Sequence, residues 1–217
     1  MKHLLQPSEG RRQFIKNAMG FACALPLAPR YLSFLQSPSP DEFAIAAQRP
    51  TRIDIAEQRE PGARILIRGA VYDLTDKPVP NVRIFLYQTD AAGHYSRPVN
   101  SPRQARLRGA VWSNAQGVYE FSSIQPGSYA DMKEPPPMHI HVHLQAPGLP
   151  DHWVDSYYFA GDPHLQERDL SRARELGRFS NIIQLTPGPA DIRRGVRHFR
   201  IDPALAERNQ LVDGWYR

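Results

Sequence analysis

Three histidines alternate with apolar residues in one short stretch of this chain. His139, His141 and His143 lie within five residues, although the whole sequence holds only 8 histidines. Successive side chains of a β-strand point to opposite faces, so a strand here presents all three imidazoles on one face. Two imidazoles on a rigid strand can chelate zinc, copper, iron or nickel about equally well. The pattern therefore predicts a metal site without naming the metal.

Two tyrosines follow glycine-containing turns elsewhere in the sequence. Tyr95 comes shortly after Gly93, and Tyr129 comes shortly after Gly127. A tyrosine at a strand end is common in proteins, because its ring packs against apolar neighbours while its hydroxyl meets water. Spacing alone therefore does not mark either tyrosine as a metal ligand.

Short apolar runs separated by turn residues fill most of the chain. The 21 prolines predict many turns, and 41% hydrophobic residues are enough for a buried core. Strands are expected at residues 65–72, 82–87, 117–121, 139–145, 153–159 and 197–201. In the second of these, Val82, Ile84 and Leu86 share one face at a period of two. With Gln166–Arg178 as the one short helix, we predict an all-β fold, a β-sandwich core of short strands with long loops.

The N-terminal region has the layout of a targeting peptide. Arg11 and Arg12 precede a short, mildly apolar stretch over residues 18–28, as in twin-arginine signals. This stretch is too short for a stable membrane span. We expect a signal peptide at 1–30, a linker or N-terminal arm at 31–60, and the sandwich domain at 61–217. Export by this route would deliver the protein to the periplasm or the extracellular space.

Charge and cysteine content narrow the class of protein. The formal charge is +5, but the basic residues are scattered and none forms a run interleaved with aromatics, so no nucleic-acid partner is expected. The only cysteine, Cys23, lies in the predicted signal peptide. The processed chain would therefore have neither a disulfide nor a thiolate metal ligand.

Taken in chain order, these pieces resemble a known family. The run Gly69–Pro163 is similar to the catalytic core of the intradiol ring-cleavage dioxygenases, the protocatechuate 3,4-dioxygenase-like family. The matching segments are Pro78–Tyr95, Asn114–Phe121, Ile124–Tyr129, His139–His141 and Tyr158–Pro163. The resemblance implies a mononuclear non-haem iron(III) held by Tyr95, Tyr129, His139 and His141.

The resemblance also implies an enzymatic activity. The chain would insert both atoms of O2 into a small aromatic diol of the catechol type and cleave the ring between the two hydroxylated carbons, giving a muconate-type product. Tyr129 and His139 would be the axial ligands, and Tyr95 and His141 the equatorial ones. The Tyr129 phenolate would take a proton from the substrate. The chain is compatible with a homo- or hetero-oligomer.

Two positions depart from the family pattern. The family usually has an arginine three residues before the first histidine and a glutamine before the Tyr-Phe strand; here these are Pro136 and Ser156. Loss of a cation that stabilises developing negative charge raises a reaction barrier. We expect Arg108, or Arg106, to supply a catalytic cation from the preceding loop.

Two other classes of protein fit part of the sequence. The stretch from Gly69 to Pro80 also resembles exported transthyretin-like or carbohydrate-binding β-sandwiches, which would make the chain a non-catalytic binding module. The three histidines alone would equally suit a zinc protein using His139, His141 and His143.

Overall fold

The computed structural model describes residues 49–95, 105–149 and 151–202, which all belong to one compact unit spanning residues 40–217. The predicted signal peptide, with Arg11, Arg12 and Cys23, lies outside the described residues. Within the described residues, no helix is long and apolar enough to cross a membrane.

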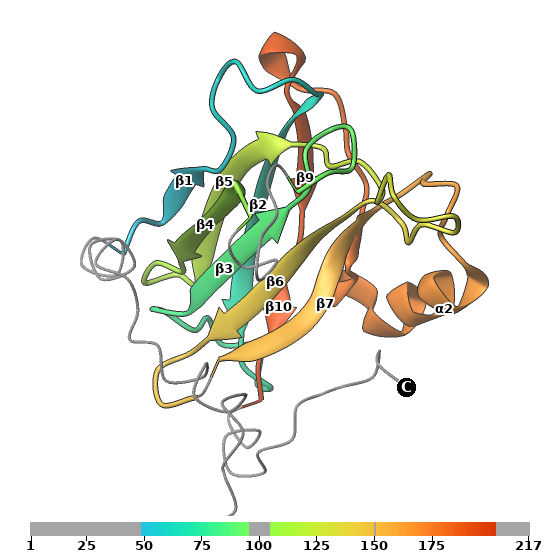
Figure 1. The fold of residues 1–217 in the computed structure, drawn as a ribbon. Coiled ribbons are helices and arrows are strands. Elements are labelled where there is room, and N and C mark those ends of the chain that lie inside the picture. The colour runs from blue at the N-terminus through green and yellow to red at the C-terminus, as the bar shows by residue number, and fades with distance from the viewer. Residues whose placement is uncertain (1–48, 96–104, 150, 203–217) are drawn as a thin grey trace, which may run out of the picture. The chain divides into compact units, whose positions relative to one another are not determined.

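Two sheets make up the described fold (Figure 1). The first has the order β1-β5-β2, with β9 and β10 both pairing in parallel with β2. Its strands are β1 (Arg52–Asp54), β2 (Arg64–Tyr72), β5 (Val118–Ile124), β9 (Arg193–Val196) and β10 (Phe199–Arg200). The second has the order β4-β3-β6-β7-β8. Its strands are β3 (Arg83–Gln88), β4 (Leu107–Trp112), β6 (His139–Gln145), β7 (His152–Phe159) and β8 (Ile182–Ile183).

One α-helix follows β7 and is joined by two short 3-10 turns. These elements are α2 (Glu167–Leu176), η4 (Gly177–Phe179) and η5 (Pro189–Asp191). The Asp169 carboxylate accepts from the Gln166 N–H at 2.9 Å, and the Asp169 N–H donates to the Gln166 carbonyl at 2.9 Å, so these two residues fix the start of α2. An ion pair between Arg172 and Asp155, at 3.8 Å, links α2 to β7, and Figure 1 shows the two elements close together.

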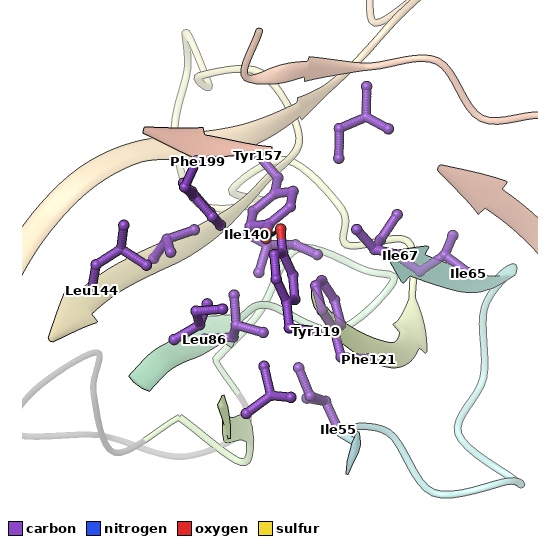
Figure 2. Packing of buried hydrophobic residues seen from close by; sticks show 14 of the residues in the cluster. Ile55, Ile65, Ile67, Leu86, Tyr119, Phe121, Ile140, Leu144, Tyr157 and Phe199 are labelled. Carbon is purple, nitrogen blue, oxygen red and sulfur yellow. Dashed lines mark hydrogen bonds between the residues drawn. The ribbon is translucent and has the colours of Figure 1, made fainter. Parts of the chain in front are cut away.

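The hydrophobic core contains the inward faces of the strands (Figure 2). Val82, Ile84 and Leu86 are fully buried, which confirms the predicted face of this strand. Ile140 and Val142 of β6 are also fully buried, so the apolar face of the histidine strand enters the core as predicted.

Two tyrosines bond to each other inside this core. The hydroxyls of Tyr119 and Tyr157 meet at 2.8 Å among apolar side chains (Figure 2). Burial raises the pKa of Tyr157 to about 12, so its phenol stays protonated. The Tyr119 hydroxyl also donates to the Arg197 carbonyl at 2.9 Å, so the Tyr157 hydroxyl donates to Tyr119 and both buried protons have a partner.

Each predicted strand overlaps a strand of the structure, but β1, β4, β8 and β9 were not predicted. The strand at 139–145 and the helix within 166–178 are confirmed. The sandwich begins before residue 61, however, because β1 pairs with β5 and Ile55 and Ala56 are buried in the core. This part of the predicted linker or arm has only three strand residues, too few for a visible alternation.

Candidate metal centre

Strand β6 fixes two imidazoles on its outward face. His139 and His141 are each 8% exposed and lie two residues apart, so their rings project to the same side. Tyr87 of β3 lies opposite His141 in register, and the two rings stack with centroids 4.5 Å apart. The stacking holds the His141 ring in one orientation before any metal arrives.

Two glycines bring the tyrosine-bearing turns together. Gly93 has φ +85°, and a Cβ there would lie 1.8 Å from the Ser128 carbonyl oxygen. A Cβ at Gly127 would lie 2.6 Å from the Gly93 nitrogen. The Gly127 N–H donates to the Asp90 carbonyl at 2.8 Å, which ties the turns directly. Only glycines allow this approach, so they determine the position of the tyrosines that follow.

Four donor atoms meet where these turns face β6. The Tyr129 hydroxyl oxygen lies 2.9 Å from His141 Nε2 and 3.0 Å from His139 Nε2. The two Nε2 atoms are 3.0 Å apart, and the Tyr95 hydroxyl lies 3.2 Å from that of Tyr129. Ligands about 2.1 Å from one cation and at right angles to each other are separated by about 3 Å, so the spacing fits a common metal. The structure thus brings all four predicted ligands together.

The histidines are held in the form that binds a metal. The Nδ1 of His139 lies 2.7 Å from the Pro137 carbonyl, which can only accept, so the proton sits on Nδ1 and Nε2 keeps its lone pair. Burial lowers the pKa of His139. Burial, followed by the neighbouring histidines, lowers the pKa of His141 to about 2. Both imidazoles are therefore neutral, as a metal requires.

A β-bulge shapes the strand beside the histidines. Ile140 pairs with Tyr157 and Val142 pairs with Val154, so two residues of β7 lie opposite His141 alone. These two residues are Asp155 and Ser156. The bulge places the Ser156 hydroxyl oxygen 3.5 Å from His141 Nδ1. A bulge of this kind redirects a side chain next to a functional site.

Two buried polar side chains hold the backbone of this bulge. Arg197 Nη2 donates to the Asp155 carbonyl at 2.6 Å, and Asn181 Nδ2 donates to the Ser156 carbonyl at 3.3 Å. Neither residue was predicted from sequence, because each acts through a backbone atom far along the chain.

Asp162 anchors the segment before His139. Its carboxylate accepts the Met138 N–H at 2.6 Å and the His164 N–H at 2.8 Å, and its side chain is buried. A buried carboxylate that accepts two backbone N–H groups is a strong, directional tie. Asp162 belongs to the Tyr158–Pro163 motif, which is the signal by which sequence could have found it.

A cavity of about 780 Å³ opens onto the candidate centre. Tyr129, His139 and His141 line it, as do Pro136 and Ser156, the two positions that depart from the family pattern. Both departures therefore lie where they were expected, at the same cavity as the predicted ligands.

The predicted catalytic cation is not brought to the site. Arg108 lies on β4 and not in a loop, which corrects the expected location, and its Nη1 donates to the Ala105 carbonyl. Arg106 makes a two-point ion pair with Glu60. Neither arginine lines the cavity; its cations among the described residues are Lys133 and Arg168. The alternation of β4 was missed because glycine and alanine interrupt it.

His143 lies in a different environment from the other two histidines. Its ring stacks on Trp153 with centroids 5.5 Å apart, and its Nδ1 lies 3.4 Å from an Asp151 carboxylate oxygen. Over the described ranges, no three His, Cys, Asp or Glu side chains group to hold a metal. The described residues therefore do not form the three-histidine zinc site, whereas Tyr129 lies against both His139 and His141.

A β-sandwich that gathers two tyrosines and two histidines in one cluster beside a cavity is the arrangement that the intradiol dioxygenase resemblance implied. The sequence model of the family described as "Dioxygenase" matches residues 36–186, which is more than half of the chain. This protein belongs to the intradiol ring-cleavage dioxygenase family.

Two characterised relatives illustrate the likeness. The protocatechuate 3,4-dioxygenase beta chain of Burkholderia cepacia is 34% identical over 134 residues, covering 55% of this chain and 57% of the relative. The chlorocatechol 1,2-dioxygenase of Rhodococcus opacus is 31% identical over 145 residues, covering 59% and 54%. The chain thus spans a little over half the length of these relatives.

Solved structures agree on the fold. The dioxygenase domain of a dioxygenase carbohydrate-binding protein fusion from Streptomyces sp. SirexAA-E superposes with a TM-score of 0.53 at 26% identity, covering 69% of this chain and 86% of that one. The catechol 1,2-dioxygenase of Pseudomonas arvilla C-1 gives 0.58 at 20% identity, covering 76% and 63%. The β-sandwich predicted from sequence is confirmed.

Proposed function

We propose that this protein is an iron(III)-dependent intradiol dioxygenase that cleaves a catechol-type ring between its two hydroxylated carbons to a muconate-type diacid, using O2. One observation carries the proposal: Tyr95, Tyr129, His139 and His141 place their donor atoms in one connected cluster, with neighbouring atoms no more than 3.2 Å apart, in a protein of this family. None of the four needs to move far to meet one cation.

The donor set favours ferric iron over zinc. Two phenolate oxygens are hard anionic ligands that stabilise a trivalent ion, whereas imidazoles alone do not discriminate. When bound, ferric iron supplies Lewis-acid activation of the diol and a template on which the diol and O2 meet.

The residues around the donors have distinct proposed roles. Tyr129, whose oxygen lies within 3.0 Å of both Nε2 atoms, would hold the metal together with Tyr95, His139 and His141, and its oxygen would be the group that accepts a proton from one diol hydroxyl. The Pro137 carbonyl and the Tyr87 ring hold the histidine rings in place, so that little reorganisation is required.

Oxygen uptake with a panel of catechols tests the proposal. Iron-replete protein should consume one O2 per catechol, and isotopically labelled O2 should place both atoms in an acyclic diacid. A Tyr129→Phe variant should lose most of the rate, because the group that accepts the proton is gone. A protein that binds iron but consumes no O2 with any catechol would instead be the non-catalytic binding module.

We also propose export of the protein by the twin-arginine route. Arg11-Arg12 followed by the short apolar stretch at 18–28 supports this. Fractionation of cells that express the full chain should find the processed protein outside the cytoplasm. Replacing both arginines with lysines should retain it inside, and unchanged export would contradict the proposal.

A further inference from the structure

The cavity at the candidate metal centre is larger than one aromatic ring requires. Its volume is about 780 Å³, and cavities of roughly 300–1,000 Å³ typically enclose ligands of drug size. A catechol with no substituent would leave most of this space to water. The donor cluster forms only one part of the lining, so the remaining space is available to another part of the ligand.

The walls of the cavity are stiff. One wall contains three consecutive prolines, Pro135, Pro136 and Pro137, whose rings fix the backbone φ angles. A second wall begins at Pro163 and continues into α2. Asp162 joins the two walls, because its carboxylate accepts N–H groups from both segments. A wall that cannot collapse keeps the space open for a ligand.

The charges around the cavity compensate one another. Asp169 lies 3.7 Å from the Arg168 side chain, and Asp155 lies 3.8 Å from Arg172. Lys133 and Glu134, the other two charged residues of the lining, are sequence neighbours of opposite sign. A negatively charged substituent on a substrate would therefore gain no net electrostatic attraction from the charged side chains of the cavity. Besides the proposed ligands, the uncharged polar residues of the lining include Ser156, Tyr158, Gln166 and Asn181.

Resting on the proposed function, we propose that the preferred substrates are catechols joined to an uncharged, polar group about the size of a second ring. The catechol binds at the donor cluster, while the second ring occupies the space against Leu165 and Gln166. There its hydroxyl or ether groups find hydrogen-bond partners. Burial of the second ring adds apolar area that simple catechols lack.

Three compounds separate this inference from the proposed function. Catechol, protocatechuate and 4-(4-hydroxyphenyl)catechol would be compared by kcat/KM from oxygen uptake, and by calorimetric Kd without O2. We expect kcat/KM at least tenfold higher, and Kd at least tenfold lower, for the two-ring compound. A value for catechol or protocatechuate that equals or exceeds it overturns the inference. If none of the three is consumed, the proposed function itself fails.

A matched pair of variants locates the second ring. Leu165→Trp fills the cavity wall, whereas Leu170→Trp makes the same change on the exposed side of α2, outside the lining. The ratio of two-ring to one-ring kcat/KM should fall at least fivefold in the first variant and stay constant in the second. Equal effects of the two variants, or none, would contradict the placement. Leu165→Phe repeats the test with a smaller group should Leu165→Trp fail to fold.

Discussion

His141 and His143 occupy the same face of the same strand, two residues apart, yet their surroundings differ. His141 faces the Tyr129 oxygen at 2.9 Å and the His139 Nε2 at 3.0 Å. His143 lies beside the carboxylate of Asp151, whereas the Trp153 indole approaches both rings, with centroids 5.7 Å from His141 and 5.5 Å from His143. Both are buried, at 8% and 3% exposure, so burial does not distinguish them.

The difference lies in what covers each end of the strand. The turns that carry Tyr95 and Tyr129 reach His139 and His141, whereas the start of β7 covers His143. His139 and His141 are likewise two positions apart, so spacing along the strand does not distinguish the predicted ligand pair from His143. The comparison shows that a histidine's neighbours in the folded protein, and not its place in the sequence motif alone, decide whether it can bind a metal.

The largest expected effect is the difference in iron binding between a variant that lacks His141, a proposed ligand, and one that lacks His143. His141→Ala should lower iron affinity by about 100-fold or more, since a direct ligand matters at least as much as its supporting groups. His143→Ala should leave iron stoichiometry and the visible absorption within twofold of the parent. Metal analysis of both purified variants is the measurement. Similar iron loss in the two would erase the distinction between the two ends of the strand.

The next largest effect tests whether the turns that carry Tyr95 and Tyr129 are what allows His141, and not His143, to bind the metal. Gly93→Ala introduces a Cβ 1.8 Å from a carbonyl oxygen, at φ +85°. Gly148→Ala adds a methyl at a similar φ, +78°, with no atom within 4 Å. Both should lose about 1–2 kcal/mol of unfolding free energy through backbone strain, and Gly93→Ala should lose more because its Cβ would overlap the carbonyl oxygen. Only Gly93→Ala should also lose iron, at least about tenfold in affinity; intact iron binding in it would show that the turns need not meet so closely.

A smaller effect is expected at the anchor before His139. Asp162→Asn exchanges a carboxylate for an amide at two backbone N–H groups, which should cost about 1–3 kcal/mol of unfolding free energy. Asp73→Asn is the control, because Asp73 also accepts two backbone N–H groups but is remote in sequence from the four ligands. Denaturant titration and metal analysis should show iron binding weakened only in Asp162→Asn. Unchanged iron binding there would make Asp162 a purely structural residue.

The smallest effect is expected at Ser156. Its hydroxyl lies at the long limit of a hydrogen bond to His141 Nδ1, 3.5 Å, so Ser156→Ala should change iron affinity by about twofold or less. Iron titration followed by absorption measures this. A tenfold loss would mean that the bulge positions His141 through Ser156 more tightly than the distance indicates.

The sequence predicted strand β6 itself better than the residues that surround it. The alternation from His139 to Leu144 predicted both faces of β6, because a period of two is a local property. The family motifs added Tyr95 and Tyr129, which spacing could not. The bulge opposite His141 and the distant supports Arg197 and Asn181 left no local pattern, because they depend on pairing between strands. Arg108 was misplaced because glycine and alanine interrupt the alternation of β4, so this strand showed no local pattern either.

The visible absorption of iron-replete protein tests the central claim most directly. Phenolate bound to ferric iron gives a red-brown charge-transfer band, which His ligands alone do not. The parent should show this band, and Tyr129→Phe and Tyr95→Phe should each weaken or shift it while keeping a folded β-sandwich by circular dichroism. A colourless iron-bound parent, or a band that neither substitution alters, would contradict the assignment of Tyr95, Tyr129, His139 and His141 as the metal ligands.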